Sequence, residues 1–222
     1  MYFFTVFDFT GVIILSRISG NGTFLDIAHR VAVSETLYRI GILCGLVGNL
    51  STILLAVGLY VTLMPIDANL AMAALLFRVV EAVLGLVVVI FGFASLNVYL
   101  EASHGGGFDV TQLGALADLV SRSSSSGIDV SVVCFSIGSA TFFYLFLRSA
   151  YIPRFLATWG LVGSLLSLFA FVGSLLFPQS SDLLRGIGAL TIGIAEPVVG
   201  FWLLVRGIKK ESGASTAANP VA

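Results

Sequence analysis

The stretch FRVVEAVLGLVVVIFGFASLNVYL, residues 77–100, is almost entirely apolar, yet Arg78 and Glu81 stand near its start. An apolar run of about 20 residues is long enough to cross the ~30 Å hydrocarbon core of a bilayer. The run therefore predicts a membrane-spanning helix. Charges inside such a helix are expensive, so Arg78 and Glu81 must have partners or a function.

The composition of the whole chain points to the same environment. Of its 222 residues, 58% are hydrophobic and only 10% are charged, and the mean hydropathy is +1.05. Soluble domains carry about 25% charged residues. We therefore predict a multi-pass membrane protein whose partner is the lipid bilayer. The net charge of −1 offers no basic surface for nucleic acid.

About six spans are expected in an all-α bundle. The first, residues 2–15, is short for a crossing at 1.5 Å per residue. Either this helix begins at the membrane interface or the natural chain starts further upstream. The remaining spans are expected at residues 34–63, 70–99, 130–147, 155–177 and 184–205.

Two shorter segments, residues 21–33 and 108–122, have an apolar stripe at helical spacing. Neither is long enough to cross, so we expect two amphipathic helices lying on the membrane surface. In the first segment, Thr23 is a candidate N-cap with Asp26 at the third helical position. The run SSSSG, residues 123–127, is expected to be a linker to the next span.

The chain is expected to form one transmembrane helical domain over residues 1–208, followed by a disordered polar tail over residues 209–222. Arg148 and Arg154 lie in the turn before the fifth span, and further basic residues follow the last span. Because Lys and Arg concentrate in cytoplasmic loops, this pattern favours a cytoplasmic C-terminus. Six spans then place both termini in the cytoplasm and both amphipathic helices on the outer surface.

Three motifs carry a resemblance to a known family: FRVVEAV at residues 77–83, YLFLRSAYIPRFLATWGLVG at residues 144–163 and EPVVGFWLLVRGIKK at residues 196–210. In this order they resemble the bacterial membrane family catalogued as domain of unknown function 4386. The resemblance implies a helical bundle in the bacterial inner membrane and assigns no activity. Many members carry a His-Asp pair at the start of the fourth span, where this chain has Ile128-Asp129.

The charged residues inside the spans are the strongest candidates for a site. Arg78 and Glu81 share a helix face, and Glu196 lies near the middle of the sixth span. These charges could form an ion pair that fixes the helix register. Alternatively, two acids and one arginine leave one carboxylate able to bind a proton or a ligand. Pro197 beside Glu196 predicts a kink and a freed backbone carbonyl.

The other polar residues have simpler interpretations. Asn49 and Asn97 are expected to make interhelical hydrogen bonds, and Asp129 is expected to cap the fourth span. His29 and His104 are expected in outer loops, and their spacing matches no metal motif. No set of catalytic residues is recognised, so an enzyme is the least favoured class.

Two functions remain open at this stage. One is a membrane protein that binds a small ligand or handles a proton at Arg78, Glu81 and Glu196. The other is a structural or accessory subunit whose charges only hold the bundle together. The candidate partners besides the bilayer are a small molecule, a lipid and other membrane subunits. The sequence identifies no cofactor.

Overall fold

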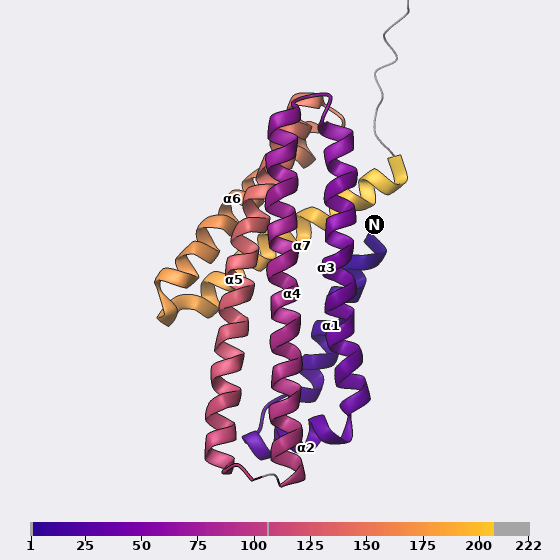
Figure 1. The fold of residues 1–222 in the computed structure, drawn as a ribbon. Helices are drawn as coiled ribbons and strands as arrows, with labels where there is room; N and C mark the ends of the chain where they lie inside the picture. The colour runs from indigo at the N-terminus through magenta and orange to yellow at the C-terminus, as the bar shows by residue number, and fades with distance from the viewer. Residues whose placement is uncertain (1, 106, 207–222) are drawn as a thin grey trace, which may run out of the picture.

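A computed structural model describes residues 2–105 and 107–206, and in this part of the chain the only regular secondary structure is helical, with short loops between the helices (Figure 1). The predicted all-α membrane bundle is confirmed. Five of the described helices, α3 to α7, are long and apolar enough to cross a membrane, and α1 is shorter. The tail predicted from residue 209 lies outside the described residues. The elements are α1 (Tyr2–Ser19), α2 (Phe24–Val33), α3 (Glu35–Leu63), α4 (Ala68–His104), α5 (Val110–Ser149), α6 (Arg154–Leu176), the 3-10 turn η1 (Pro178–Ser180) and α7 (Ser181–Arg206).

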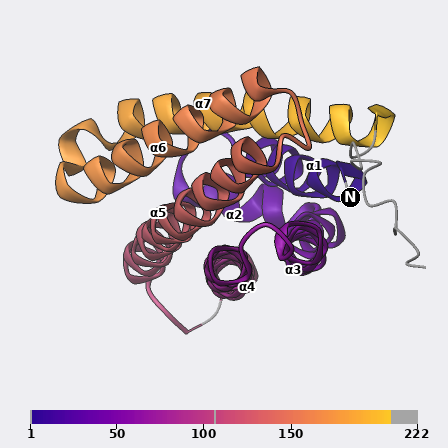
Figure 2. The ribbon, with the colours of Figure 1, turned by 90° about the horizontal axis from the view of Figure 1, so that it is seen from above.

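The long helices pack mainly against their neighbours in sequence, from α3 to α7, and α1 packs on α3. Figure 2 shows α6 and α7 side by side in one layer, with α3, α4 and α5 below them in this view and α1 between α3 and α7. The α3–α4 loop and the end of α5 lie at the same end of the bundle. There Arg148 Nη1 is 3.1 Å from a carboxylate oxygen of Asp67.

Close packing between α5 and α6 depends on small residues. A Cβ atom on Gly160 of α6 would meet the ring of Phe143 on α5. The Ser164 hydroxyl donates to the carbonyl of Gly160, 2.8 Å away in its own helix, so it can be buried without a partner on another helix. Small residues of this kind let helices approach closely in lipid, where no hydrophobic force draws them together.

The first half of α5 corrects the sequence analysis. The predicted amphipathic helix at residues 108–122, the linker at residues 123–127 and the fourth span form one continuous helix of 40 residues. Serine is only a few tenths of a kcal/mol worse than alanine within a helix. Packing of Leu113 and Ala117 against Val98 of α4 stabilises the extension. At 1.5 Å per residue α5 is about 60 Å long, about twice the hydrocarbon thickness.

The other predicted amphipathic segment, residues 21–33, contains the separate helix α2, as predicted. Thr23 and Asp26 form a reciprocal capping box at its start. Its apolar stripe, however, packs on the protein rather than on lipid: Ala28 and Val31 are 1% and 0% exposed, and α2 contacts α4 and α1. A stripe of this width suits either environment, and only the position of the neighbouring helices decides between them.

Candidate functional site

Three polar residues from three helices lie at a similar depth. Arg78 stands ten residues after the start of α4, and Ser139 ten residues before the end of α5. Glu196 stands ten residues before the last described residue of α7. Each therefore lies about 15 Å along its own helix from that residue, and the hydrogen bonds among the three side chains place them at one level of the bundle.

Arg78 is at the centre of this group and is 4% exposed. Its Nη1 atom lies 3.1 Å from Glu81 Oε2 and 3.9 Å from Glu196 Oε1. The same nitrogen donates a hydrogen bond to Ser139 Oγ at 3.3 Å, and Ser139 Oγ donates to Glu196 Oε1 at 2.9 Å. We call these four residues the Arg78 cluster. The structure thus brings together the three charged residues selected from the sequence and adds Ser139.

The surroundings of Arg78 fit its shape closely. The guanidinium carbon lies 4.4 Å from the centre of the Phe135 ring, a distance at which a cation is attracted to an aromatic face. Gly138 lies under the arginine stem, where a Cβ would come 3.0 Å from the Arg78 Cγ. The buried Nε of Arg78 has no hydrogen-bond acceptor among the residues that the structure describes. A buried donor without an acceptor is costly. The side chains of the cluster therefore do not satisfy all of its hydrogen-bonding groups.

The two glutamates of the cluster differ in their surroundings. Glu81 has 14% of its side chain exposed and lies nearer the guanidinium, whereas Glu196 has 31% exposed. The backbone carbonyl of Glu81 also accepts a hydrogen bond from Ser131 on α5 at 3.0 Å. When both acids are ionised, the cluster carries a net charge of −1. Of the two carboxylates, that of Glu196 is the more exposed.

A cavity of about 40 Å³ adjoins the cluster. Arg78, Ser139 and Glu196 form its polar side, and apolar residues of α3, α5 and α7 form its other walls. A single water requires roughly 10–15 Å³ of such space, so the cavity has room for about three waters or a guest of similar size. Glu196 therefore borders a space inside the bundle that can hold a small polar guest.

The remaining predicted site residues are not part of the cluster. Asn49 donates to the carbonyl of Gly45 in its own helix at 2.8 Å and packs against Gly85 of α4. Asn97 is exposed and lines a shallow groove with Gln112. Neither asparagine makes an interhelical hydrogen bond within residues 2–105 and 107–206, so that prediction is wrong for both.

Pro197 lies next to Glu196, within a helix that continues without interruption to Arg206. Because proline has no N–H, the carbonyl of Gly193 lacks its usual donor four residues later. This backbone oxygen is one turn before the cluster. The freed carbonyl predicted from the sequence is thus consistent with the course of α7.

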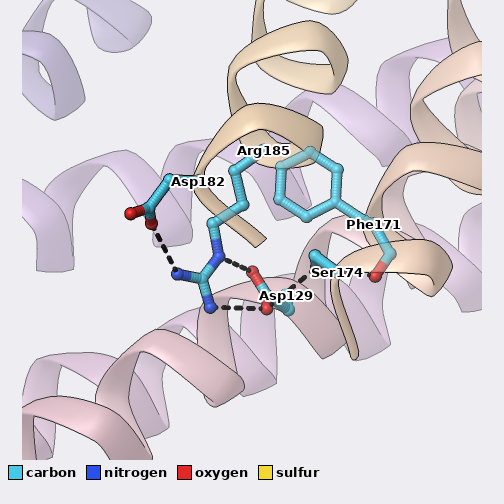
Figure 3. Close-up of polar contacts among 5 residues, drawn as sticks. All are labelled: Asp129, Phe171, Ser174, Asp182 and Arg185. Carbon is cyan, nitrogen blue, oxygen red and sulfur yellow. Dashed lines mark hydrogen bonds and ion pairs between the residues drawn. The ribbon is translucent and has the colours of Figure 1, made fainter. Parts of the chain in front are cut away.

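A second polar group joins α5, α6 and α7 (Figure 3). Asp129 is 1% exposed and accepts two hydrogen bonds from Arg185, from Nε and from Nη2, each at 2.8 Å. Ser174 Oγ donates to the same carboxylate at 3.1 Å. Asp182, which is fully exposed, lies 3.8 Å from Arg185 Nη1. Asp129 is far inside α5, so its predicted role as a helix cap is wrong.

Sequence reasoning missed Arg185 as the partner of Asp129. A signal was present, because a carboxylate next to an apolar span needs a compensating cation. Arg185 is the basic residue at the start of the last span. The register that places it beside Asp129, with Ser174 between, depends on how α6 and α7 pack and is not visible in the sequence.

Comparison with known proteins supports the architecture. The chain matches the family described as a domain of unknown function, DUF4386, over residues 3–207. It belongs to this family. No curated protein and no solved structure matches the chain significantly. Since the family description assigns no activity, the chemistry has to be argued from the Arg78 cluster and the Asp129–Arg185 pair.

Proposed function

We propose that this membrane protein binds and releases a proton at Glu196, with Arg78 and Glu81 as a fixed ion pair beside it. One observation carries the proposal: two carboxylates share one guanidinium, at 3.1 Å for Glu81 and 3.9 Å for Glu196. The nearer carboxylate compensates the arginine more completely. Glu196 is the more exposed of the two acids and lies further from the guanidinium, so it is the one we assign to proton binding.

The position of the cluster makes its net charge important. A charged side chain near the middle of a span costs about 2.5–3.5 kcal/mol on insertion scales, and simulations give more. Protonation of Glu196 removes that penalty. Ser139 supports both states, since a hydroxyl can donate to a carboxylate and accept from a carboxylic acid. The adjoining cavity is large enough for waters that carry the proton to and from the carboxylate.

Infrared difference spectroscopy of the purified protein during a pH titration tests the proposal. The other carboxylates of the chain also protonate as the pH falls, so we expect the carbonyl band of the Glu196 carboxylic acid as one component of the signal that is missing from Glu196→Gln. Glu101→Gln is the matched control, because Glu101 lies near the far end of the same helix as Glu81 and outside the cluster. An identical band in Glu196→Gln would overturn the proposal.

A structural role is the second candidate. It is favoured by the fact that Arg78 joins α4 to α5 through Ser139 and to α7 through Glu196. In that case the charges would only hold the helices in register. Glu196 would then show no infrared titration, while Arg78→Ala would still prevent folding.

We also propose that the protein lies in a bacterial inner membrane with both termini in the cytoplasm. Arg148 and Arg154 flank the α5–α6 turn, and α7 ends in Arg206. At the other end of the bundle, Arg30 donates to backbone carbonyls at the end of α1 and Arg39 pairs with an acid of its own helix. Reporter fusions after residue 213 test this orientation. Fusions that are active only in the periplasm would contradict it.

A further inference from the structure

We infer that the cavity beside Glu196 also binds a small organic cation with an ammonium group, in competition with the proton. The inference rests on the proposed function, because it uses the same carboxylate. It names the class of ligand that the chemistry of the cavity fits. Charge, wall chemistry and size support it independently.

The charge of the cluster favours a cation. Arg78 is paired with Glu81 at 3.1 Å, so its repulsion of a second cation is reduced. Glu196 lines the cavity, lies further from Arg78 and is the more exposed of the two acids. A monovalent cation next to Glu196 would bring the net charge of the cluster from −1 to zero. In a medium of low dielectric constant this compensation is worth more than in water.

The walls favour an organic cation over a hard metal ion. Phe142, Phe143 and Phe146 line the cavity, and they are 3%, 6% and 3% exposed. Aromatic faces attract ammonium groups and bind methylated ones in preference to compact hydrated ions. Among the described lining residues, only Ser139 and Glu196 offer side-chain oxygens. Ca²⁺ and Mg²⁺ require about six or more oxygen ligands.

The size of the cavity limits the ligand. If one water takes roughly 10–15 Å³, a methylammonium ion with two heavy atoms takes about twice that. This fits within the 40 Å³ available. A tetraethylammonium ion is several times too large. The cavity therefore predicts a sharp cut-off between these two cations.

Competition with the proton links the two ligands. When methylammonium binds to the protonated site, the carboxylic acid of Glu196 loses its proton to solvent and the carboxylate pairs with the cation. The charge of the cluster stays at zero throughout this exchange. By linkage, a proton must weaken methylammonium binding by the same factor by which methylammonium weakens proton binding. A protein with this property can exchange one cation for the other.

The experiment uses the purified full-length protein in detergent with methylammonium chloride as the probe. Tetraethylammonium chloride at equal ionic strength is the size control. Binding is followed by the thermal unfolding temperature and by proton release into weakly buffered solution. At a pH at which the infrared titration shows Glu196 protonated, we expect a saturable rise in unfolding temperature and about one proton released per site.

Two variants make the result specific. Glu196→Gln should abolish both signals, whereas Glu101→Gln should keep them. Phe142→Leu keeps an apolar wall but removes one ring face, and should weaken methylammonium binding roughly three- to thirtyfold. Equal responses to methylammonium and tetraethylammonium would overturn the inference. So would a response that persists in Glu196→Gln.

The two proposals can fail separately. If Glu196 titrates in the infrared but methylammonium gives neither signal, the cation site is wrong and the proton site stands. If methylammonium binds without releasing a proton and Glu196 does not titrate, both the proposed function and the competition are wrong.

Discussion

Two arginines of this protein meet carboxylates between the long helices, and they do so in different ways. Arg185 makes two 2.8 Å hydrogen bonds to one acid, Asp129, whose side chain is 1% exposed. Within the described part of the chain, Arg78 makes no such paired contact. Its single Nη1 atom contacts Ser139, Glu81 at 3.1 Å and Glu196 at 3.9 Å. A cavity adjoins this group.

The difference separates a structural contact from a candidate site. Asp129 and Arg185 match in charge and geometry, and Ser174 satisfies a further lone pair of the carboxylate. Such a pair has nothing left to bind. The four residues of the Arg78 cluster carry a net charge of −1 when both acids are ionised, and the cluster has a buried N–H without an acceptor among the described residues and room for a guest beside it. Incomplete compensation next to a cavity is the feature that favours function.

The largest loss of stability is expected from Arg78→Ala. Removing this side chain leaves two carboxylates near the middle of the membrane without their cation. Breaking a buried ion pair costs about 3–5 kcal/mol. We expect poor yield and a strongly lowered thermal unfolding temperature, measured in detergent by the fluorescence of the two tryptophans.

A triple variant separates charge from packing in that result. Arg78→Ala combined with Glu81→Gln and Glu196→Gln removes the uncompensated charges and should recover part of the lost stability. If the triple variant is no more stable than Arg78→Ala alone, the cluster is not held together by charge.

Breaking the Asp129–Arg185 pair is expected to destabilise the protein slightly less. The loss of stability should depend on which of the two residues is removed. Arg185→Ala leaves Asp129 buried without a cation, at a cost of about 3 kcal/mol. Asp129→Ala leaves Arg185, whose side chain is 33% exposed and can be solvated. Arg185→Ala should therefore unfold at a clearly lower temperature than Asp129→Ala. Equal losses in the two variants would mean that Asp129 is not buried as described.

The sequence predicted much of this arrangement, because hydropathy, helical spacing and charge are local properties. The Arg78–Glu81 pair follows from their spacing, and Glu196 from its position in an apolar span. The continuous course of α5 could not be predicted, since its serine run suits a linker as well as a helix and the packing of Leu113 and Ala117 on α4 is not visible in the sequence. Ser139 and Arg185 join their sites through helix register, which depends on packing between distant segments.

The smallest change in stability is expected when an exposed ion pair outside the spans is broken. Hydrogen bonds from the backbone N–H of Leu70, together with Arg148, hold the pKa of Asp67 below its usual value. A lowered folded-state pKa means that Asp67 stabilises the protein above about pH 4, its unfolded value, and loses this effect as the pH falls through the lower folded value. Asp67→Asn keeps the helix cap but lacks the charge.

Unfolding temperatures measured between neutral and acidic pH test this. The wild-type advantage over Asp67→Asn should be constant near neutrality and shrink in strong acid. Raised salt should also reduce it, because an exposed pair is screened. An advantage that grows with acidity would contradict the assignment.

The central claim is that Glu81 compensates Arg78 while Glu196 carries the excess charge. Thermal unfolding of Glu81→Gln and Glu196→Gln, compared at one near-neutral pH, tests it most directly. Glu81→Gln removes the nearer partner of a buried guanidinium and should cost about 2 kcal/mol. Glu196→Gln removes an excess charge and should leave the unfolding temperature unchanged or raise it. A loss in Glu196→Gln as large as that in Glu81→Gln would contradict the account.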